Sequence, residues 1–171
     1  MKAWLAVLAL LFLSGEAWQA TAQKAGGGAT QLVGTWRLVS DTQRLTDGTV
    51  RPDPQTGPRG MGYVMYSETG RICAVLANPD RPKWSSETAP VDAELRTAFD
   101  GLVAYCGTYE VDEAQGTVVH HVELDKVPNR AGLVRKRHFE VSGNQLVLRP
   151  APPLPEGVQQ WTIVFERVTG N

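Results

Sequence analysis

Short segments rich in β-branched and aromatic residues, separated by turn signals, follow one another along most of this chain. Such segments, joined through turns such as TDGT at 46–49 and ETG at 68–70, are typical of antiparallel strands connected in sequence order. The pattern predicts eight strands, at residues 32–45, 60–67, 71–77, 106–111, 117–124, 133–141, 145–150 and 159–168.

One segment, residues 88–105, has its apolar residues at helical spacing instead of alternating. Thr88 is the expected N-cap, Pro90 falls in the first turn, and Asp92 and Glu94 suit the positive end of the helix dipole. We expect the apolar face of this helix to close the core; its members are Val91, Leu95, Ala98, Phe99 and Leu102.

Eight sequential strands with one α-helix between the third and fourth predict an all-β fold, an eight-stranded up-and-down antiparallel β-barrel. Closure removes the exposed sheet edges, and the helix would act as a plug or lid at one end of the barrel. A sandwich of two sheets is the structural alternative. A barrel of about eight strands is either filled by side chains or holds one small ligand.

The first 22 residues read as a signal peptide. A lysine near the start precedes an apolar run at 3–13, and Ala20-Thr21-Ala22 matches the small-x-small pattern of a cleavage site. The apolar run is shorter than the roughly 20 residues that span a bilayer, which disfavours the alternative of a membrane anchor. We therefore expect an exported protein, periplasmic or secreted, without a stable membrane span after cleavage. Residues 23–30 would form a flexible lead to a barrel domain at 31–169.

Charge gives no indication of a polyanionic partner, because the formal net charge is −1. The one dense basic cluster, RKRH at 135–138, lies in a predicted strand, where successive side chains point to opposite faces. Nucleic-acid binding is therefore not expected. The oligomeric state stays open.

Several segments together resemble the lipocalin-like domain family of small bacterial and fungal proteins, which have calycin-type barrels. They are LVGTWRLVS at 32–40, YSETGRICAVLANPDRP at 66–82, AYCGTYEVDEAQGTVVHHVE at 104–123 and LVRKRHFEV at 133–141. The resemblance covers roughly residues 32–168. It implies that Gly34 and Trp36 carry the structural signature at the closed barrel end, with Arg167 packed across the tryptophan. It also implies a cavity for a small molecule.

The two adjacent histidines raise the question of a metal site. Alternation places His120 inward with Val118, Val122 and Leu124, and His121 on the opposite face. The two rings therefore cannot ligate the same ion, and zinc needs three or four ligands that converge. We predict neither a metal nor a cofactor.

Two arginines share the inward parity of Leu133, Phe139 and Val141, namely Arg135 and Arg137. A buried charge that lacks its partner costs on the order of 3–5 kcal/mol. The nearby acids all fall on outward faces; they are Glu110, Asp112, Glu123 and Glu140. A cavity with water or an acidic ligand fits this pattern better than a dry core. The expected ligand-binding residues are Tyr66, Tyr109, His120, Arg135, Arg137 and Trp161.

The two cysteines, Cys73 and Cys106, would be exposed to an oxidising compartment, where a disulfide is permitted. In the predicted register, Cys73 near the start of its strand faces the far end of the strand that Cys106 opens. That separation exceeds the roughly 7 Å between Cα atoms that a disulfide tolerates. Two separate free thiols are favoured, with a disulfide as the alternative.

The leading interpretation is an exported protein that binds a small, largely apolar molecule carrying an acidic or carbonyl group. One alternative is an isomerase or cyclase that acts on a natural-product-like substrate in the same cavity, with His120 as the best catalytic candidate. The sequence shows no nucleophile elbow and no Ser–His–Asp pattern, so a binding protein is favoured over an enzyme. The other alternative is a non-catalytic structural or stress protein of the envelope with a solid barrel.

Overall fold

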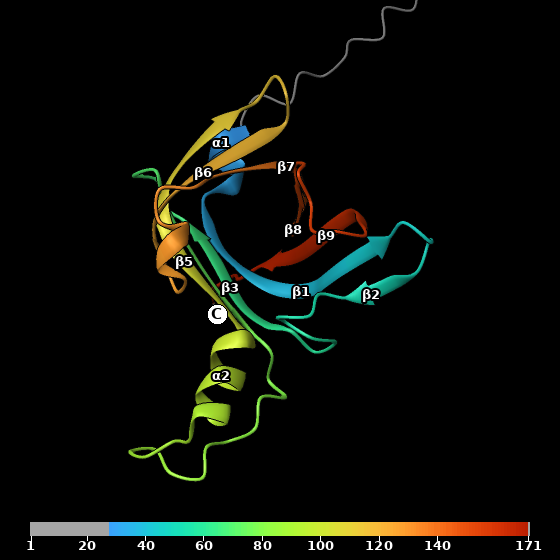
Figure 1. Ribbon diagram of the computed structural model, residues 1–171. Coiled ribbons are helices and arrows are strands. Elements are labelled where there is room, and N and C mark those ends of the chain that lie inside the picture. Colours follow the sequence, from blue (N-terminus) through green and yellow to red (C-terminus); the bar gives the residue numbers. More distant parts are fainter. Residues whose placement is uncertain (1–27, 171) are drawn as a thin grey trace, which may run out of the picture.

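A computed structural model describes residues 28–170, in which an antiparallel sheet closes on itself (Figure 1). The strands are β1 (Gly34–Leu45), β2 (Val50–Pro52), β3 (Met61–Tyr66), β4 (Arg71–Ala77), β5 (Leu102–Asp112), β6 (Thr117–Asp125), β7 (Val134–Ser142), β8 (Gln145–Pro150) and β9 (Val158–Arg167). The helices are α1 (Gly28–Leu32), α2 (Asp92–Asp100) and the 3₁₀ turn η1 (Pro128–Arg130).

Eight of these strands form the barrel, which confirms the predicted fold class. The strand order is β2-β1-β3-β4-β5-β6-β7-β8-β9, and a further pairing between β1 and β9 closes the sheet. The short β2 is additional and pairs with the far half of β1, Thr42 lying opposite Pro52. All three of its residues are exposed, so no alternation of apolar and polar residues marks it in the sequence. The predicted position of the helix, between the third and fourth strands, is wrong in this count, because α2 follows β4.

Helix α2 differs from the prediction in its bounds and in its packing. It begins after Val91 instead of Thr88, and the carboxylate of Glu94 accepts the Val91 N–H at 2.9 Å. Its apolar side is not covered: Leu95 and Phe99 are each 44% exposed. Figure 1 shows the helix projecting away from the barrel, so the predicted plug or lid is wrong. Helical spacing identifies an apolar face but not the surface that covers it.

The predicted signal peptide at 1–22 and most of the predicted flexible lead lie outside the described residues. From residue 28 the lead is helical, as the first turn of α1. No helix in residues 28–170 is long and apolar enough to cross a membrane.

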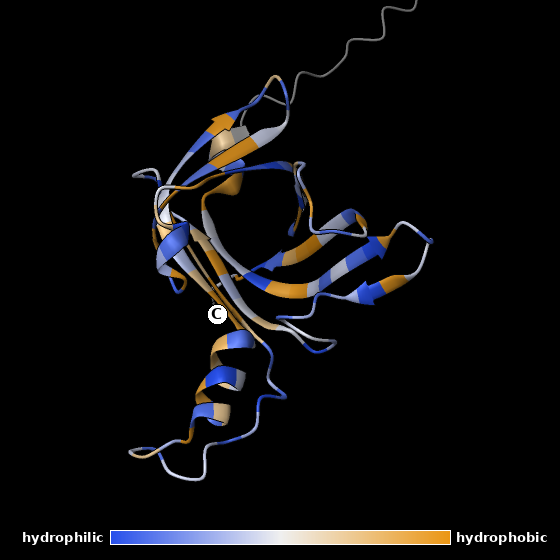
Figure 2. Ribbon diagram, viewed as in Figure 1, coloured by the Kyte–Doolittle hydropathy of each residue, from blue (hydrophilic) through white to orange (hydrophobic). Residues whose placement is uncertain are grey.

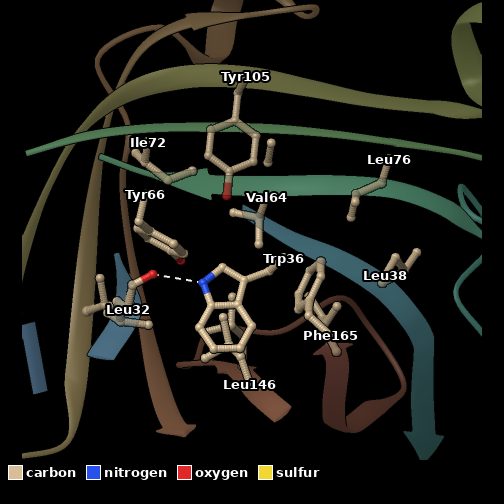
Figure 3. Close-up of a cluster of buried hydrophobic side chains, with 14 of the residues drawn as sticks. Leu32, Trp36, Leu38, Val64, Tyr66, Ile72, Leu76, Tyr105, Leu146 and Phe165 are labelled. Carbon is tan, nitrogen blue, oxygen red and sulfur yellow. Dashed lines mark hydrogen bonds between the residues drawn. The ribbon is translucent and has the colours of Figure 1, made fainter. Parts of the chain in front are cut away.

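The closed end of the barrel is built around Trp36, which is fully buried. Its indole Nε1–H donates to the carbonyl oxygen of Leu32 in α1 at 2.7 Å (Figure 3). The guanidinium of Arg167 lies 4.0 Å from the centroid of the Trp36 ring. The contact that the family resemblance implies is therefore present.

Arg167 also ties α1 to the last strand. Its Nη1 donates to the Val33 carbonyl at 2.7 Å and its Nη2 to the Gln31 carbonyl at 2.6 Å. Gly34 lies beside it with φ of +135°, and a Cβ atom there would sit 2.7 Å from Nη1 of Arg167. The positive backbone angle is therefore the reason that glycine is favoured at 34.

The apolar core fills the barrel around this end. Figure 2 shows hydrophobic and hydrophilic bands alternating along the strands, as expected when one face of each strand lines the interior. The largest buried apolar side chains are Leu32, Trp36, Val64, Tyr66, Ile72, Val118, Leu146 and Phe165.

Two β-bulges reverse the inward parity within a strand. On β1 the pairing with β9 shifts between Leu38 and Ser40, and Asp41 beyond the shift becomes buried. On β6 the pairing with β5 passes from Val122 directly to Leu124, which leaves an extra residue on that strand. Leu124 is consequently 64% exposed, and its predicted inward position is wrong.

Cys73 and Cys106 form a disulfide, which corrects the favoured expectation of two free thiols. The two residues lie directly opposite each other in the β4–β5 register, with their Cα atoms 4.1 Å apart. The predicted register failed because β5 begins at Leu102, directly after α2, and not at Cys106. Cys106 therefore lies inside the strand instead of opening it.

Candidate ligand-binding cavity

The barrel encloses a cavity of about 660 Å³ that lies away from the Trp36 end and reaches the rim beside β7 and the 150–155 loop. Its deep wall is apolar and is formed by Val64, Ala74, Leu76, Leu148, Ile163 and Phe165. The polar side chains in its wall include Asp41, Gln43, Tyr105, Arg135, Arg137 and Trp161.

Arg137, on β7, is a half-buried cation of this wall that makes no close ion pair with the described residues. Its Nη2 donates to the Tyr105 hydroxyl at 3.3 Å. Among residues 28–170 no carboxylate lies within 4.0 Å of its guanidinium. An arginine stays protonated at any physiological pH and offers five N–H donors in a planar fork. Most of these donors have no partner among the described side chains.

Arg135, two residues earlier on the same face, is paired. Its Nη2 lies 2.7 Å from Oδ2 of Asp125, whose side chain is only 3% exposed. Its guanidinium also stacks 4.4 Å from the centroid of the Tyr105 ring. The expectation that no acid reaches the inward arginines is therefore wrong for Arg135. The bulge on β6 turns Asp125 inward, where strict alternation would have left it outside.

A chain of hydrogen bonds runs inward from Arg137. The Tyr105 hydroxyl lies 3.0 Å from Nδ1 of His120, and the Tyr66 hydroxyl lies 2.9 Å from Nε2 of the same ring. His120 is fully buried. Burial, together with the nearby charges of Arg137 and Arg135, lowers the pKa of His120 well below 6.5. The imidazole is therefore neutral at physiological pH.

The predicted ligand-binding residues divide into two groups. Arg135, Arg137 and Trp161 line the cavity. Tyr66 and His120 lie behind Tyr105 and are not part of the wall. Tyr109 is also outside it: its hydroxyl donates to the Ser67 carbonyl at 2.9 Å.

Tyr105, which does line the cavity, was missed by the sequence interpretation. The predicted helix extended through this residue, whereas α2 ends at Asp100. The signal was present in the sequence: Gly101 is followed by LVAYC, a run typical of a strand.

A buried acid, Asp41, occupies another part of the wall. The indole Nε1–H of Trp161 donates to its Oδ1 at 2.6 Å, and the Thr56 hydroxyl donates to its Oδ2 at 3.1 Å. Burial, with a smaller contribution from the charge of Asp53, raises the pKa of Asp41 to about 6. Asp41 is therefore mostly ionised at neutral pH and becomes neutral in mildly acidic solution.

Further hydrogen bonds hold this part of the wall in place. The Gln43 amide donates to Oδ2 of Asp53 at 2.7 Å, and Nη2 of Arg51 donates to the Gln43 carbonyl oxygen at 3.0 Å. Gln43 and Asp53 are both buried. This network joins β1 to the chain that follows β2 and fixes the position of Asp41 between them.

Residues 28–170 contain no group of three or more histidine, cysteine, aspartate or glutamate side chains placed to hold an ion. His121 points away from His120, to the outer face, where its Nε2 lies 3.5 Å from Oε1 of Glu110.

The fold and the cavity together define a small antiparallel β-barrel with one end closed by a tryptophan under an arginine and one internal space of ligand size. The model of the lipocalin-like domain matches residues 33–168, so the chain belongs to the lipocalin-like domain family. No curated protein matches the sequence.

Several solved structures match this chain at low identity, and two of them illustrate the similarity. One is an uncharacterized protein from Bacteroides eggerthii, 12% identical, with a TM-score of 0.41 over 80% of this chain and 99% of that one. The other is a mutant of the fluorescent protein UnaG, 13% identical, with a TM-score of 0.36 over 82% of this chain and 98% of that one.

Proposed function

We propose that this protein is an exported binding protein whose barrel cavity holds a small, largely apolar molecule with an acidic or carbonyl group. The observation that carries the proposal is Arg137, a cation in the cavity wall without a carboxylate partner in the described chain. A buried charge without a partner is costly to keep. An acceptor group on a bound molecule would offset that cost.

The size and lining of the cavity support a molecule of modest size. A volume of about 660 Å³ falls within the roughly 300–1,000 Å³ of ordinary ligand pockets. Burial of apolar ligand surface against Val64, Leu148 and Phe165 would contribute about 25 cal/mol per Å². A charge-assisted hydrogen bond to Arg137 would add about 1.5–3 kcal/mol and would orient the molecule.

Export is supported by two independent features. The apolar run at 3–13, followed by a small-x-small site, is typical of a signal peptide. The Cys73–Cys106 disulfide is typical of proteins that fold in an oxidising compartment.

The geometry gives less support to the two alternatives. His120, the candidate base of an isomerase or cyclase, has both ring nitrogens occupied by tyrosine hydroxyls and does not line the cavity. A solid barrel is hard to reconcile with the cavity itself.

The first experiment compares the native and denatured masses of protein purified from Gln23 onward. We expect a discrete excess mass that denaturation releases as one small molecule. If the masses agree, dodecanoate is added to protein that has been stripped of bound lipid, and the thermal midpoint is followed as its concentration rises. The proposal fails if no molecule co-purifies and dodecanoate leaves the midpoint unchanged.

A further inference from the structure

His120 is held between two tyrosine hydroxyls. The donors and acceptors around its ring indicate which of its two nitrogens carries the proton. A neutral imidazole has one N–H donor and one acceptor nitrogen. Nδ1 faces the Tyr105 hydroxyl at 3.0 Å, and Nε2 faces the Tyr66 hydroxyl at 2.9 Å. Each tautomer therefore sets the direction of both tyrosine O–H groups.

With the proton on Nε2, the ring donates to the oxygen of Tyr66 and accepts the O–H of Tyr105 at Nδ1. The hydrogen of Tyr66 then needs another acceptor. Tyr66 is 2% exposed, and His120 is the only hydrogen-bond partner of its hydroxyl in the described chain. This tautomer leaves a buried donor unsatisfied, which disfavours it by roughly 5- to 150-fold.

With the proton on Nδ1, the buried Tyr66 hydroxyl and both ring nitrogens of His120 are satisfied. Tyr66 donates its O–H to Nε2, and Nδ1–H donates to the oxygen of Tyr105. That oxygen also accepts from Nη2 of Arg137 at 3.3 Å, so both of its lone pairs are used. The Tyr105 hydrogen is then left without a partner inside the described protein, and Tyr105 lines the cavity.

We infer that the acceptor group of the bound molecule is held jointly by the Tyr105 hydroxyl and the Arg137 guanidinium, and that His120 and Tyr66 are positioning residues that aim the Tyr105 hydrogen into the cavity. The inference rests on the proposed function for its ligand. It assigns His120 a role that needs neither catalysis nor contact with that ligand.

The arrangement selects for a particular head group. Two converging donors suit a carboxylate or carbonyl oxygen, which offers two lone pairs, and they repel an ammonium group. With a dodecyl chain kept constant, we expect dodecanoate to bind most tightly, dodecanol more weakly and dodecylamine weakest.

The tautomer can be measured without any ligand. In the variant His121→Gln/His138→Gln, which replaces residues outside the cavity wall, His120 is the only histidine of the chain. Long-range ¹H–¹⁵N correlation spectra distinguish a ring protonated at Nδ1 from one protonated at Nε2. We expect the Nδ1–H form across about pH 6–8, because the ring stays neutral there. An Nε2–H ring, or a doubly protonated one, would overturn the inference.

The contact itself is tested by affinity. Tyr105→Phe removes the proposed donor and should weaken dodecanoate binding by about 10- to 100-fold, because a hydrogen bond to an ionised group is lost. Tyr63→Phe, on the outer surface and 45% exposed, is the matched control and should leave the affinity unchanged. Unchanged affinity in Tyr105→Phe would overturn the joint contact. Failure of dodecanoate to bind even the unmodified protein, when no molecule co-purifies either, would contradict the proposed function instead, and the spectrum alone would then decide the role of His120.

Discussion

Arg167 and Arg137 both extend from barrel strands toward the interior, at opposite ends of the barrel, but their guanidinium groups differ in how many hydrogen-bond partners the protein gives them. Arg167 lies on the face of Trp36 and donates to two backbone carbonyls of the segment that closes the barrel. Arg137 donates to one tyrosine hydroxyl and faces the cavity. The closed end satisfies its polar groups internally, and the cavity end leaves donors available.

The difference separates residues that stabilise the fold from residues that are available for binding. Packing at the closed end is complete, so a truncation there should lower stability. At the cavity end a polar side chain that lacks a partner adds cost to the folded protein, and its removal should lower affinity more than stability. Substitutions at the closed end should therefore mainly lower stability, and substitutions at the cavity end should mainly lower affinity.

The largest effect is expected at the closed end. Trp36→Ala removes a fully buried ring from beneath Arg167 and from the hydrogen bond to Leu32. We expect the free energy of unfolding in urea to fall by about 3–5 kcal/mol. Val39→Ala, at a residue 52% exposed on the same strand, should change it by no more than about 0.5 kcal/mol. A small loss in Trp36→Ala would contradict the stabilising role of this end.

Next in size is the buried ion pair beside the cavity. Asp125→Asn leaves Arg135 without its carboxylate and should cost about 2–4 kcal/mol, somewhat below the fully buried case because the Arg135 side chain is 20% exposed. The matched change on the same strand is Glu123→Gln, which breaks the exposed pair with Arg71 and should cost at most about 1 kcal/mol. Equal losses in the two variants would show that the bulge does not bury Asp125.

The pH dependence of stability tests the environment of Asp41. Its pKa is raised from 3.8 to about 6 in the folded state, so the folded protein holds the proton more tightly than the unfolded chain does. The free energy of unfolding should therefore fall as the pH rises through this interval, by roughly 3 kcal/mol from this residue. Urea unfolding from about pH 4 to about pH 7.5 should show this fall in the unmodified protein and lack this component in Asp41→Asn. Parallel curves for the two proteins would contradict the burial of an ionisable Asp41.

The smallest stability change is expected at Arg137. Arg137→Met replaces a cation that lacks an acidic partner with an apolar side chain of similar length. The unfolding free energy should stay the same or rise by up to about 2 kcal/mol. Arg135→Met is the comparison, because it leaves the buried carboxylate of Asp125 without its cation and should lower stability. A marked loss in Arg137→Met would indicate that the cation is satisfied inside the protein after all.

The sequence was sufficient for the barrel, through its turn signals, and for the inward position of Arg137, through alternation within one strand. The Trp36 signature rested on the resemblance to the lipocalin-like family. The sequence was insufficient wherever a bulge reversed the inward and outward positions of the side chains along a strand. Asp41 and Asp125 reach the interior only because a bulge precedes each of them, and no residue type marks either bulge. A register shift on a neighbouring strand cannot be seen in the alternation of a single strand.

Boundaries between elements were the second source of error. Tyr105 and the Cys73–Cys106 pair were both misplaced because residues 102–105 were assigned to the helix. The apolar residues of that segment fit a helical face as well as a strand, and short apolar runs do not distinguish the two. The strand assignment would have placed Tyr105 in phase with Tyr109.

The most direct measurement is the affinity of the barrel for dodecanoate and dodecylamine, determined by calorimetry on the unmodified protein and on Arg137→Met. We expect the unmodified protein to prefer dodecanoate, and we expect Arg137→Met to lose about 10- to 100-fold in dodecanoate affinity while dodecylamine binding does not weaken. Equal dodecanoate affinity in the two proteins would contradict the claim that Arg137 binds the acidic group of the ligand.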